Sequence, residues 1–197
     1  MIRLLIILSA MFGLSGCIVF DKKSEAVAFY QFSSPQASAI DSGPVVFVTR
    51  AMIPHALRRP NLVMQDDAGW VRVEDSHRWI APLDRLISEV VANQLTSATG
   101  ISTTLVAPAA DHLVLLITVE RMAIKAPNKE ATLSIHFRLE HSSGEVIREK
   151  TSTWTSAINS SNPAEFVRAQ SKNLANATLD ISTWVNPSGT NPKPKQP

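Results

Sequence analysis

The sequence is poor in the residues that catalytic and metal sites most often need. Among 197 residues it has a single cysteine, Cys17, seven glycines, one tyrosine and five scattered histidines. One cysteine excludes an intramolecular disulfide framework and a cysteine-based zinc cluster. The charge is also low, because 19 Lys and Arg against 17 Asp and Glu leave a formal net charge of +2. Without a basic excess the chain lacks the electrostatic footprint of nucleic-acid binding, so we expect no nucleic-acid partner.

Motifs of the common enzyme classes are missing as well. The sequence contains no G-x-S-x-G elbow, no phosphate-binding G-x-x-x-x-G-K-[ST], no G-x-G-x-x-G and no H-E-x-x-H. His136 and His141 differ in strand parity, and no set of Asp, Glu or Cys ligands accompanies them. Asp66 and Asp67 stand shortly before a glycine, which is typical of a turn. We therefore predict no catalytic residue, no metal site and no cofactor.

The most apolar run of the chain lies near its first residue. Arg3 precedes eleven mostly apolar residues, 4–14, which would rise about 16 Å as a helix. The hydrocarbon core of a membrane is about 30 Å thick, which is more than this run can cross, so the run predicts a secretory signal and not a membrane span. The simplest alternative is an ordinary signal peptide with a chance cysteine near its cleavage site.

The end of this signal, Leu14-Ser15-Gly16-Cys17, resembles a bacterial lipobox. In such signals the cysteine receives a diacylglycerol, the peptide is cut before it, and the new amine is acylated. The resemblance implies a signal peptide over residues 1–16, lipid attachment at Cys17 and an acylated tether over residues 17–28. Ile18 occupies the position where an inner-membrane retention signal carries aspartate, which favours the periplasmic leaflet of the outer membrane. Two or three acyl chains would anchor the protein stably.

The remaining sequence predicts one α+β domain over residues 29–185. Apolar alternation and β-branched runs predict strands at 29–32, 45–49, 62–65, 70–74, 113–119, 131–140 and 145–155. Apolar residues at helical spacing predict helices at 82–100 and 162–185. We expect a single, largely antiparallel sheet of about six strands with both long helices packed on one face. The tail, residues 186–197, holds four prolines and no large apolar side chain, so we expect it to be disordered.

Several spaced positions resemble a known family of bacterial lipoproteins. A strand is followed by a Pro- and Arg-containing loop, a hairpin and an Arg-Trp pair just before a helix. The matching positions are Tyr30, Pro54, Leu57, Arg59, Pro60, Arg78, Trp79, Pro82 and Leu83. With the lipobox, they are similar to the PqiC/YmbA-type auxiliary lipoproteins of ABC-type/MCE transport systems. Arg58 and Ala81 depart from the pattern, because that family often carries acidic residues at these positions.

The resemblance implies a non-catalytic subunit of an intermembrane lipid transport system. The protein would sit on the outer membrane, dock a periplasmic MCE-domain protein of the same system and support envelope integrity. The residues expected to contact that partner are Pro54, Leu57, Arg58, Arg59 and Pro60. Those expected to have a structural role are Tyr30, Arg78, Trp79, Pro82 and Leu83. A homo-oligomer is compatible with this function, because the partners are oligomeric.

Two other functions remain as alternatives to docking. The first is a free-standing periplasmic lipoprotein that binds a small apolar ligand between its sheet and its helices. The second is a hydrolase whose site has no known motif. Co-purification of an MCE protein would favour docking, and co-purification of small lipids alone would favour the ligand-binding alternative.

Overall fold

The computed structural model describes residues 25–36, 44–66, 68–125 and 129–185. The predicted signal peptide, Cys17, residues 17–24 of the tether and the proline-rich tail lie outside these residues. What was predicted for them therefore stays a prediction.

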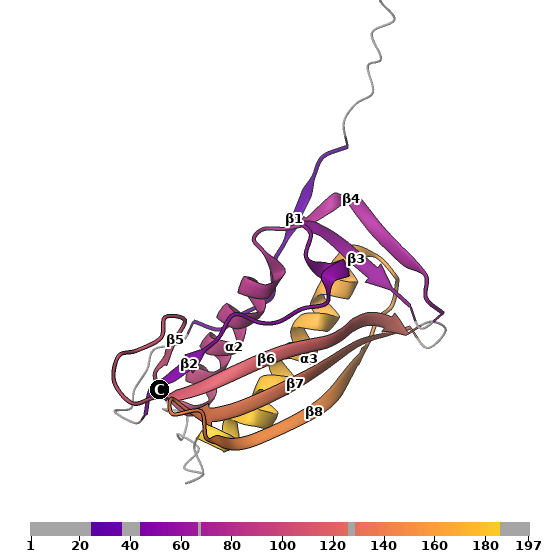
Figure 1. The fold of residues 1–197 in the computed structure, drawn as a ribbon. Helices are drawn as coiled ribbons and strands as arrows, with labels where there is room; N and C mark the ends of the chain where they lie inside the picture. Colours follow the sequence, from indigo (N-terminus) through magenta and orange to yellow (C-terminus); the bar gives the residue numbers. More distant parts are fainter. Residues whose placement is uncertain (1–24, 37–43, 67, 126–128, 186–197) are drawn as a thin grey trace, which may run out of the picture.

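The described chain forms two sheets, one short 3₁₀ helix and two long α-helices (Figure 1). The strands are β1 (Ala28–Tyr30), β2 (Val46–Val48), β3 (Asn61–Gln65), β4 (Val71–Trp79), β5 (Thr103–Thr104), β6 (Leu113–Lys125), β7 (Glu130–His141) and β8 (Val146–Ala157). The helices are η1 (His55–Leu57), α2 (Leu83–Thr99) and α3 (Pro163–Val185).

The prediction of one largely antiparallel sheet is wrong. The strands form a three-stranded sheet in the order β1-β4-β3 and a five-stranded sheet in the order β5-β2-β6-β7-β8. Both sheets are mixed, because β1 pairs with β4, and β2 with β5 and β6, in parallel. These three parallel pairs join strands that are distant in sequence, and no local periodicity specifies such partners. The short strand β5 was also not predicted.

The hairpins follow the sequence closely. Asp66 Oδ1 accepts hydrogen bonds from the amides of Ala68 and Trp70, at 3.0 and 2.9 Å, and Gly69 has φ of 86° between β3 and β4. Gly144 has φ of 91° between β7 and β8. A positive φ favours glycine, so both turns confirm the predicted hairpins.

The ends of the long helices are also as predicted. Gly100 ends α2 in the left-handed conformation, with φ of 75°, and its amide donates to Thr96 O at 2.7 Å. At the start of α3 the Asn162 side chain accepts a hydrogen bond from the Glu165 amide at 2.8 Å. Glu165 also pairs with Arg168, and the hydrogen bond from that guanidinium lowers the pKa of Glu165.

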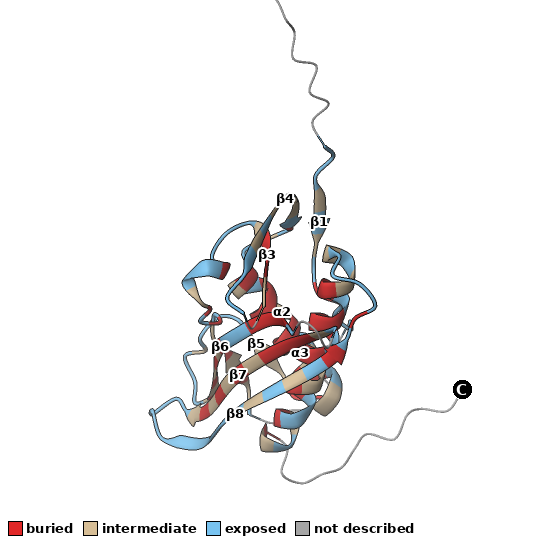
Figure 2. Ribbon diagram, turned by 90° about the vertical axis from the view of Figure 1, so that its right-hand side faces the viewer, coloured by how far each residue is buried: buried red, intermediate tan, exposed pale blue. Residues whose placement is uncertain are grey.

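Both long helices pack on one face of the five-stranded sheet, as predicted (Figure 1). The residues of β6 and β7 that face the helices alternate with partly exposed ones, and they include Leu115, Ile117, Ile135 and Phe137, all fully buried. Figure 2 shows the buried segments of the helices and of the long strands gathered in the interior. This apolar layer is the core of the domain.

A polar cluster lies inside that core, beneath α3. Gln170 Nε2 donates to carbonyl oxygens of β6 and β7, at 3.3 and 3.0 Å. Asn173 Nδ2 donates to Ala131 O at 2.9 Å and to Gln170 Oε1 at 3.3 Å, while its Oδ1 accepts from Ser156 Oγ at 2.7 Å. Both amide side chains have no exposed surface, and both find partners. We call Gln170, Asn173, Ser156 and Ala131 the α3 cluster.

The three-stranded sheet lies at one end of the molecule, and the described chain begins there with β1 (Figure 1). Tyr30 in β1 accepts a hydrogen bond at its carbonyl from the Ile80 amide, at 2.9 Å. The corner between β4 and α2 is therefore tied to the strand that follows the predicted tether.

Candidate groove at the start of helix α2

A groove of about 470 Å³ lies between the loop that contains η1 and the corner between β4 and α2. Its lining comes from two stretches of sequence about twenty residues apart. The lining residues are Arg50, Ile53, Leu57, Arg58, Arg59, Pro60, Trp79, Ile80, Ala81, Pro82, Leu83 and Asp84. We call this site the α2 groove.

The α2 groove brings together the two motifs found in the sequence. Leu57, Arg58, Arg59 and Pro60 form one wall, and Trp79, Pro82 and Leu83 belong to the other. A backbone hydrogen bond from the Trp79 amide to Pro60 O, at 2.7 Å, joins the two motifs directly. The two motifs, which are separated in the sequence, therefore form one site in the fold.

The wall residues that the sequence motif supplied differ in what they contact. Leu57 is only 3% exposed, so its side chain belongs to the core and holds the η1 loop in place. Trp79 is also buried, with its ring 4.9 Å from that of Phe32. By contrast Ile80, next to Trp79, is 60% exposed. An apolar side chain of this size in water, beside a groove, is typical of a binding surface when others lie near it.

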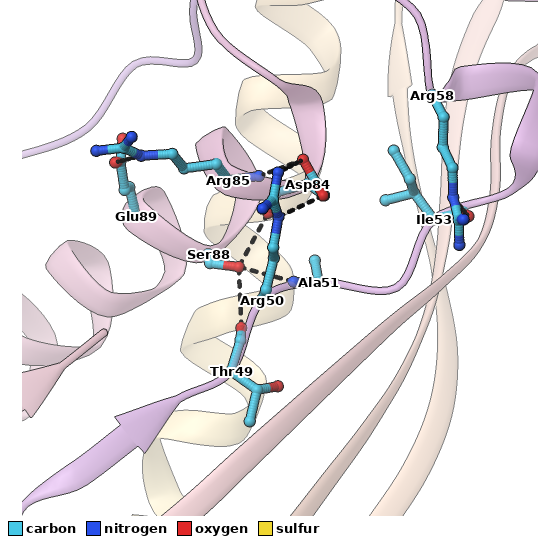
Figure 3. A network of polar contacts seen from close by, with 9 residues as sticks. All are labelled: Thr49, Arg50, Ala51, Ile53, Arg58, Asp84, Arg85, Ser88 and Glu89. Carbon is cyan, nitrogen blue, oxygen red and sulfur yellow. Dashed lines mark hydrogen bonds and ion pairs between the residues drawn. The ribbon is translucent and has the colours of Figure 1, made fainter. Parts of the chain in front are cut away.

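Polar contacts attach the chain after β2 to the first turns of α2 (Figure 3). The buried Ser88 hydroxyl accepts a hydrogen bond from the Ala51 amide at 2.9 Å, and it lies 2.9 Å from both Thr49 O and Asp84 O, to one of which it donates. Arg50 Nε and Nη2 donate to the two carboxylate oxygens of Asp84, at 2.5 and 3.2 Å. We call Arg50, Asp84, Ser88, Ala51 and Thr49 the α2 cluster.

Asp84 is held in its charged form. Its partial burial favours the neutral acid, but the hydrogen bonds from Arg50 and from two backbone amides outweigh this, so the pKa of Asp84 lies below its ordinary value. The same pair raises the pKa of Arg50. Asp84 also lies in the first turn of α2, where a negative charge complements the helix dipole.

The other two arginines of the groove have no carboxylate partner among the described residues. Arg58 Nε donates to Ile53 O at 3.3 Å, which leaves its terminal nitrogens available, and Arg59 is exposed. By contrast, Arg50, Arg72, Arg85, Arg138 and Arg168 each pair with a carboxylate. The α2 groove thus combines apolar walls with two guanidinium groups that carry uncompensated charge.

Three of the residues singled out in the sequence do not line the groove. Pro54 precedes η1, and Arg78 is an exposed residue of β4 that lies opposite Phe29 in β1. Tyr30 hydrogen-bonds His77 Nδ1 through its hydroxyl, at 2.9 Å, which links β1 to β4. Tyr30 and Arg78 therefore belong to the pairing of β1 with β4 that supports the groove.

Sequence reasoning missed Arg50 and Asp84 at the polar edge of the groove, and Ser88, which attaches α2 to the segment after β2. Arg50, Ser88 and Asp84 belong to no recognised motif, although a serine on the apolar face of the predicted helix was a visible irregularity. Ser88 is buried where α2 packs against the segment after β2, and its hydroxyl accepts a hydrogen bond from the Ala51 amide of that segment.

The part of the chain that the structure describes holds no cluster of metal-ligating side chains. Within residues 25–36, 44–66, 68–125 and 129–185, no group of three or more His, Cys, Asp or Glu is placed to hold a metal ion. None of the helices in this part of the chain is long and apolar enough to span a membrane.

Comparison with known proteins agrees with the motifs that meet at the groove. Residues 30–182 match the family described as the ABC-type transport auxiliary lipoprotein component. The match covers most of the chain, so the chain belongs to this family, and the resemblance found in the sequence is confirmed. Membership implies a lipid-anchored, non-catalytic protein that works with an ABC-type transport system.

Solved structures show the same fold. A crystal structure described only as an uncharacterized protein has a TM-score of 0.70 and 18% identity, and the match covers 82% of this chain and 99% of that one. Protein XCC0632 from Xanthomonas campestris, of the family DUF330, has a TM-score of 0.68 and 16% identity, with 80% and 94% covered. The comparison with curated proteins gave no match. At these identities the solved structures establish the fold alone.

Proposed function

We propose that this protein is an outer-membrane-anchored docking subunit of an MCE-type intermembrane lipid transport system, and that it supports envelope integrity. Family membership supports the association with an ABC-type system. The sequence that precedes the folded domain supports a location at the outer membrane, since Ile18 follows Cys17 at the position where an inner-membrane retention signal would carry aspartate. The mechanism is positional: the anchor fixes one end of the domain, and the η1 loop presents a surface to the periplasmic partner.

One observation carries this proposal. The two motifs that the sequence shares with the family meet at a single exposed site, the α2 groove, and that site adjoins β1. Packing alone would not require exposed side chains at this site, yet Arg59 of the shared pattern is exposed, and so are Arg58 and Ile80, which the shared pattern does not include. Arginine at the centre of an interface is a frequent source of binding energy, and an acidic patch on the MCE protein would complement Arg58 and Arg59.

Docking is tested by capture of the MCE protein encoded in the same cell. The bait is the acylated mature protein, and the variant is His55→Glu with Ala56→Trp on the exposed outer side of η1, away from the groove lining. Because a bulky, acidic loop surface would block the contact, we expect capture to fall at least tenfold. The matched control, Ile147→Trp with Lys150→Glu on exposed positions of β8, should capture as wild type does.

Two results would contradict docking. One is equal capture by the η1 variant and the control, and the other is recovery of small lipids without any MCE protein.

The anchor is tested separately by cell fractionation. Cys17→Ala should move the protein from the outer-membrane fraction to the soluble periplasmic fraction. Persistent membrane association of that variant would argue against lipidation at Cys17.

A further inference from the structure

We propose that the α2 groove binds the phosphate headgroup and adjoining methylenes of an anionic phospholipid, drawn from the membrane in which the protein is anchored. This goes beyond docking, because it assigns a ligand to the groove itself. Four features carry it: two unpaired guanidinium groups, an apolar wall, a neutralised carboxylate and the position of the groove beside the first strand.

The cationic side of the groove suits a phosphodiester. Arg58 and Arg59 follow one another on one wall and have no carboxylate partner among the described residues. A guanidinium group presents donors in a planar fork that matches phosphate oxygens. An arginine that served only solubility would gain nothing from lying at the mouth of an apolar groove.

The single acidic residue of the groove does not oppose an anion. Asp84 accepts two hydrogen bonds from Arg50, so the charges of this pair cancel at the groove edge. The lining therefore holds three arginines against one aspartate, and the excess charge resides on Arg58 and Arg59. An anionic ligand would meet a net positive site.

The apolar side of the groove suits a short length of hydrocarbon. Ile53, Leu57, Trp79 and Leu83 contribute buried side chains to its walls, and the exposed Ile80 stands at its margin. A volume of about 470 Å³ lies within the range of small-molecule sites. It can hold a headgroup and a few methylenes, while the rest of the acyl chains would stay in the bilayer.

The position of the groove selects a membrane lipid over free phosphate. Ile80 is hydrogen-bonded to Tyr30 of β1, and Phe29 of β1 is 62% exposed. Ten residues lie between the predicted attachment site at Cys17 and Ala28, and such a segment spans no more than about 40 Å. The groove and two large apolar side chains thus lie at the end of the fold nearest to the anchor.

Photo-cross-linking in a defined bilayer tests the site without any partner protein. The acylated mature chain is placed in phosphatidylcholine nanodiscs that contain a small fraction of phosphatidylglycerol with a photoreactive group near the top of one acyl chain. After irradiation, mass spectrometry should find lipid on peptides that contain Ile53, Leu57 or Ile80. The yield at these peptides should fall at least fivefold for Arg58→Gln with Arg59→Gln, and also for photoreactive phosphatidylcholine.

The matched control is Arg148→Gln with Lys150→Gln on β8, which makes the same change of net charge far along the chain from the groove. It should retain the wild-type yield. The proposal is overturned if label is confined to the N-terminal segment, if both headgroups label the groove equally, or if the groove variant labels like the control. Loss of labelling in the presence of millimolar inorganic phosphate would also overturn the proposal, since such competition would identify a free-anion site.

The docking variant separates this proposal from the proposed function. His55→Glu with Ala56→Trp should keep the lipid label, so failure of docking and failure of lipid binding are distinguishable.

Discussion

Two polar clusters attach the two long helices to the rest of the fold, and they do so in different surroundings. The α3 cluster is completely buried, and its amide groups bond to strand carbonyls, to each other and to Ser156. The α2 cluster has one buried member that bonds to the backbone, Ser88, while its ion pair, Arg50 with Asp84, reaches the surface at the groove. One helix is fixed from inside, and the other is fixed at the edge of the α2 groove.

The two clusters differ in how much they contribute to stability and in how accessible their surroundings are to a ligand or partner. Unsatisfied polar groups are costly in a low-dielectric interior, so the α3 cluster determines one position for α3 on the sheet. At the α2 groove water screens the charges, so Arg50 and Asp84 contribute little to folding, and Arg58 and Arg59 are available to a ligand or partner. The end of the domain that carries the α2 groove is thus the one that exposes charged side chains to water.

The comparison of the two clusters predicts that substitutions in the α3 cluster have the largest effect on stability. Asn173→Ala removes the partner of Ser156 Oγ and a donor to Ala131 O, and it leaves a small cavity. We expect the free energy of unfolding to fall by about 3 kcal/mol. Urea denaturation followed by circular dichroism measures this. Asn176→Ala, on a less buried position of the same helix, is the control, and an equal loss there would show that the α3 cluster has no special role.

A smaller loss is expected at the buried part of the α2 cluster. Ser88→Ala leaves the Ala51 amide without its hydrogen-bond partner, and a buried orphan donor of this kind costs about 1.5 kcal/mol. The same denaturation measurement applies, with Ser97→Ala on the exposed side of α2 as control. If Ser88→Ala destabilised the protein as much as Asn173→Ala, the proposed contrast between the two helices would be wrong.

The ion pair should give a still smaller effect, and one that depends on pH. The pKa of Asp84 is lowered in the fold, below an unfolded value of about 4. Its carboxylate therefore contributes stability above about pH 4, and this contribution is lost as the pH falls through the folded pKa. Wild type should exceed Asp84→Asn in stability at pH 7, and the difference should shrink below about pH 3. A difference that grew on acidification would contradict this; Asp111→Asn controls for net charge.

The smallest effect on stability is expected from the unpaired arginines. Arg58→Gln with Arg59→Gln should change the free energy of unfolding by less than about 0.5 kcal/mol, because both side chains are exposed and neither pairs with a carboxylate in the described chain. Thermal unfolding of this variant beside wild type checks the value. A loss above 1 kcal/mol would mean that the pair stabilises the η1 loop, and its use as a binding variant would then fail.

The elements that the sequence predicted well are those with local causes. Gly69 and Gly144 adopt positive φ in the two predicted hairpins, and Gly100 and Asn162 mark predicted helix ends. Each depends on residues within a few positions along the chain. The assignment of strands to sheets failed because β1 and β2 find partners that the periodicity of a short strand does not identify.

The candidate site was predicted in the same uneven way. The motifs supplied Leu57 to Pro60 and Trp79 to Leu83, and the structure places both on one groove. The sequence did not show that Leu57 is a core residue while Arg58 is exposed, since that depends on the η1 turn. It also missed Arg50 and Ser88, whose contacts span more than thirty residues.

The amino-acid sequence by itself determined the predicted export signal and anchor, the α+β class, the local turns and caps, and the family. These follow from short-range patterns, because a signal, a helix face or a glycine turn is defined within one segment. Only the tertiary structure divided the strands into two sheets and joined the two motifs into a groove beside β1. The reason is physical: burial and hydrogen bonding choose among distant partners only when the whole chain is packed, and a groove exists only between surfaces that packing has brought together.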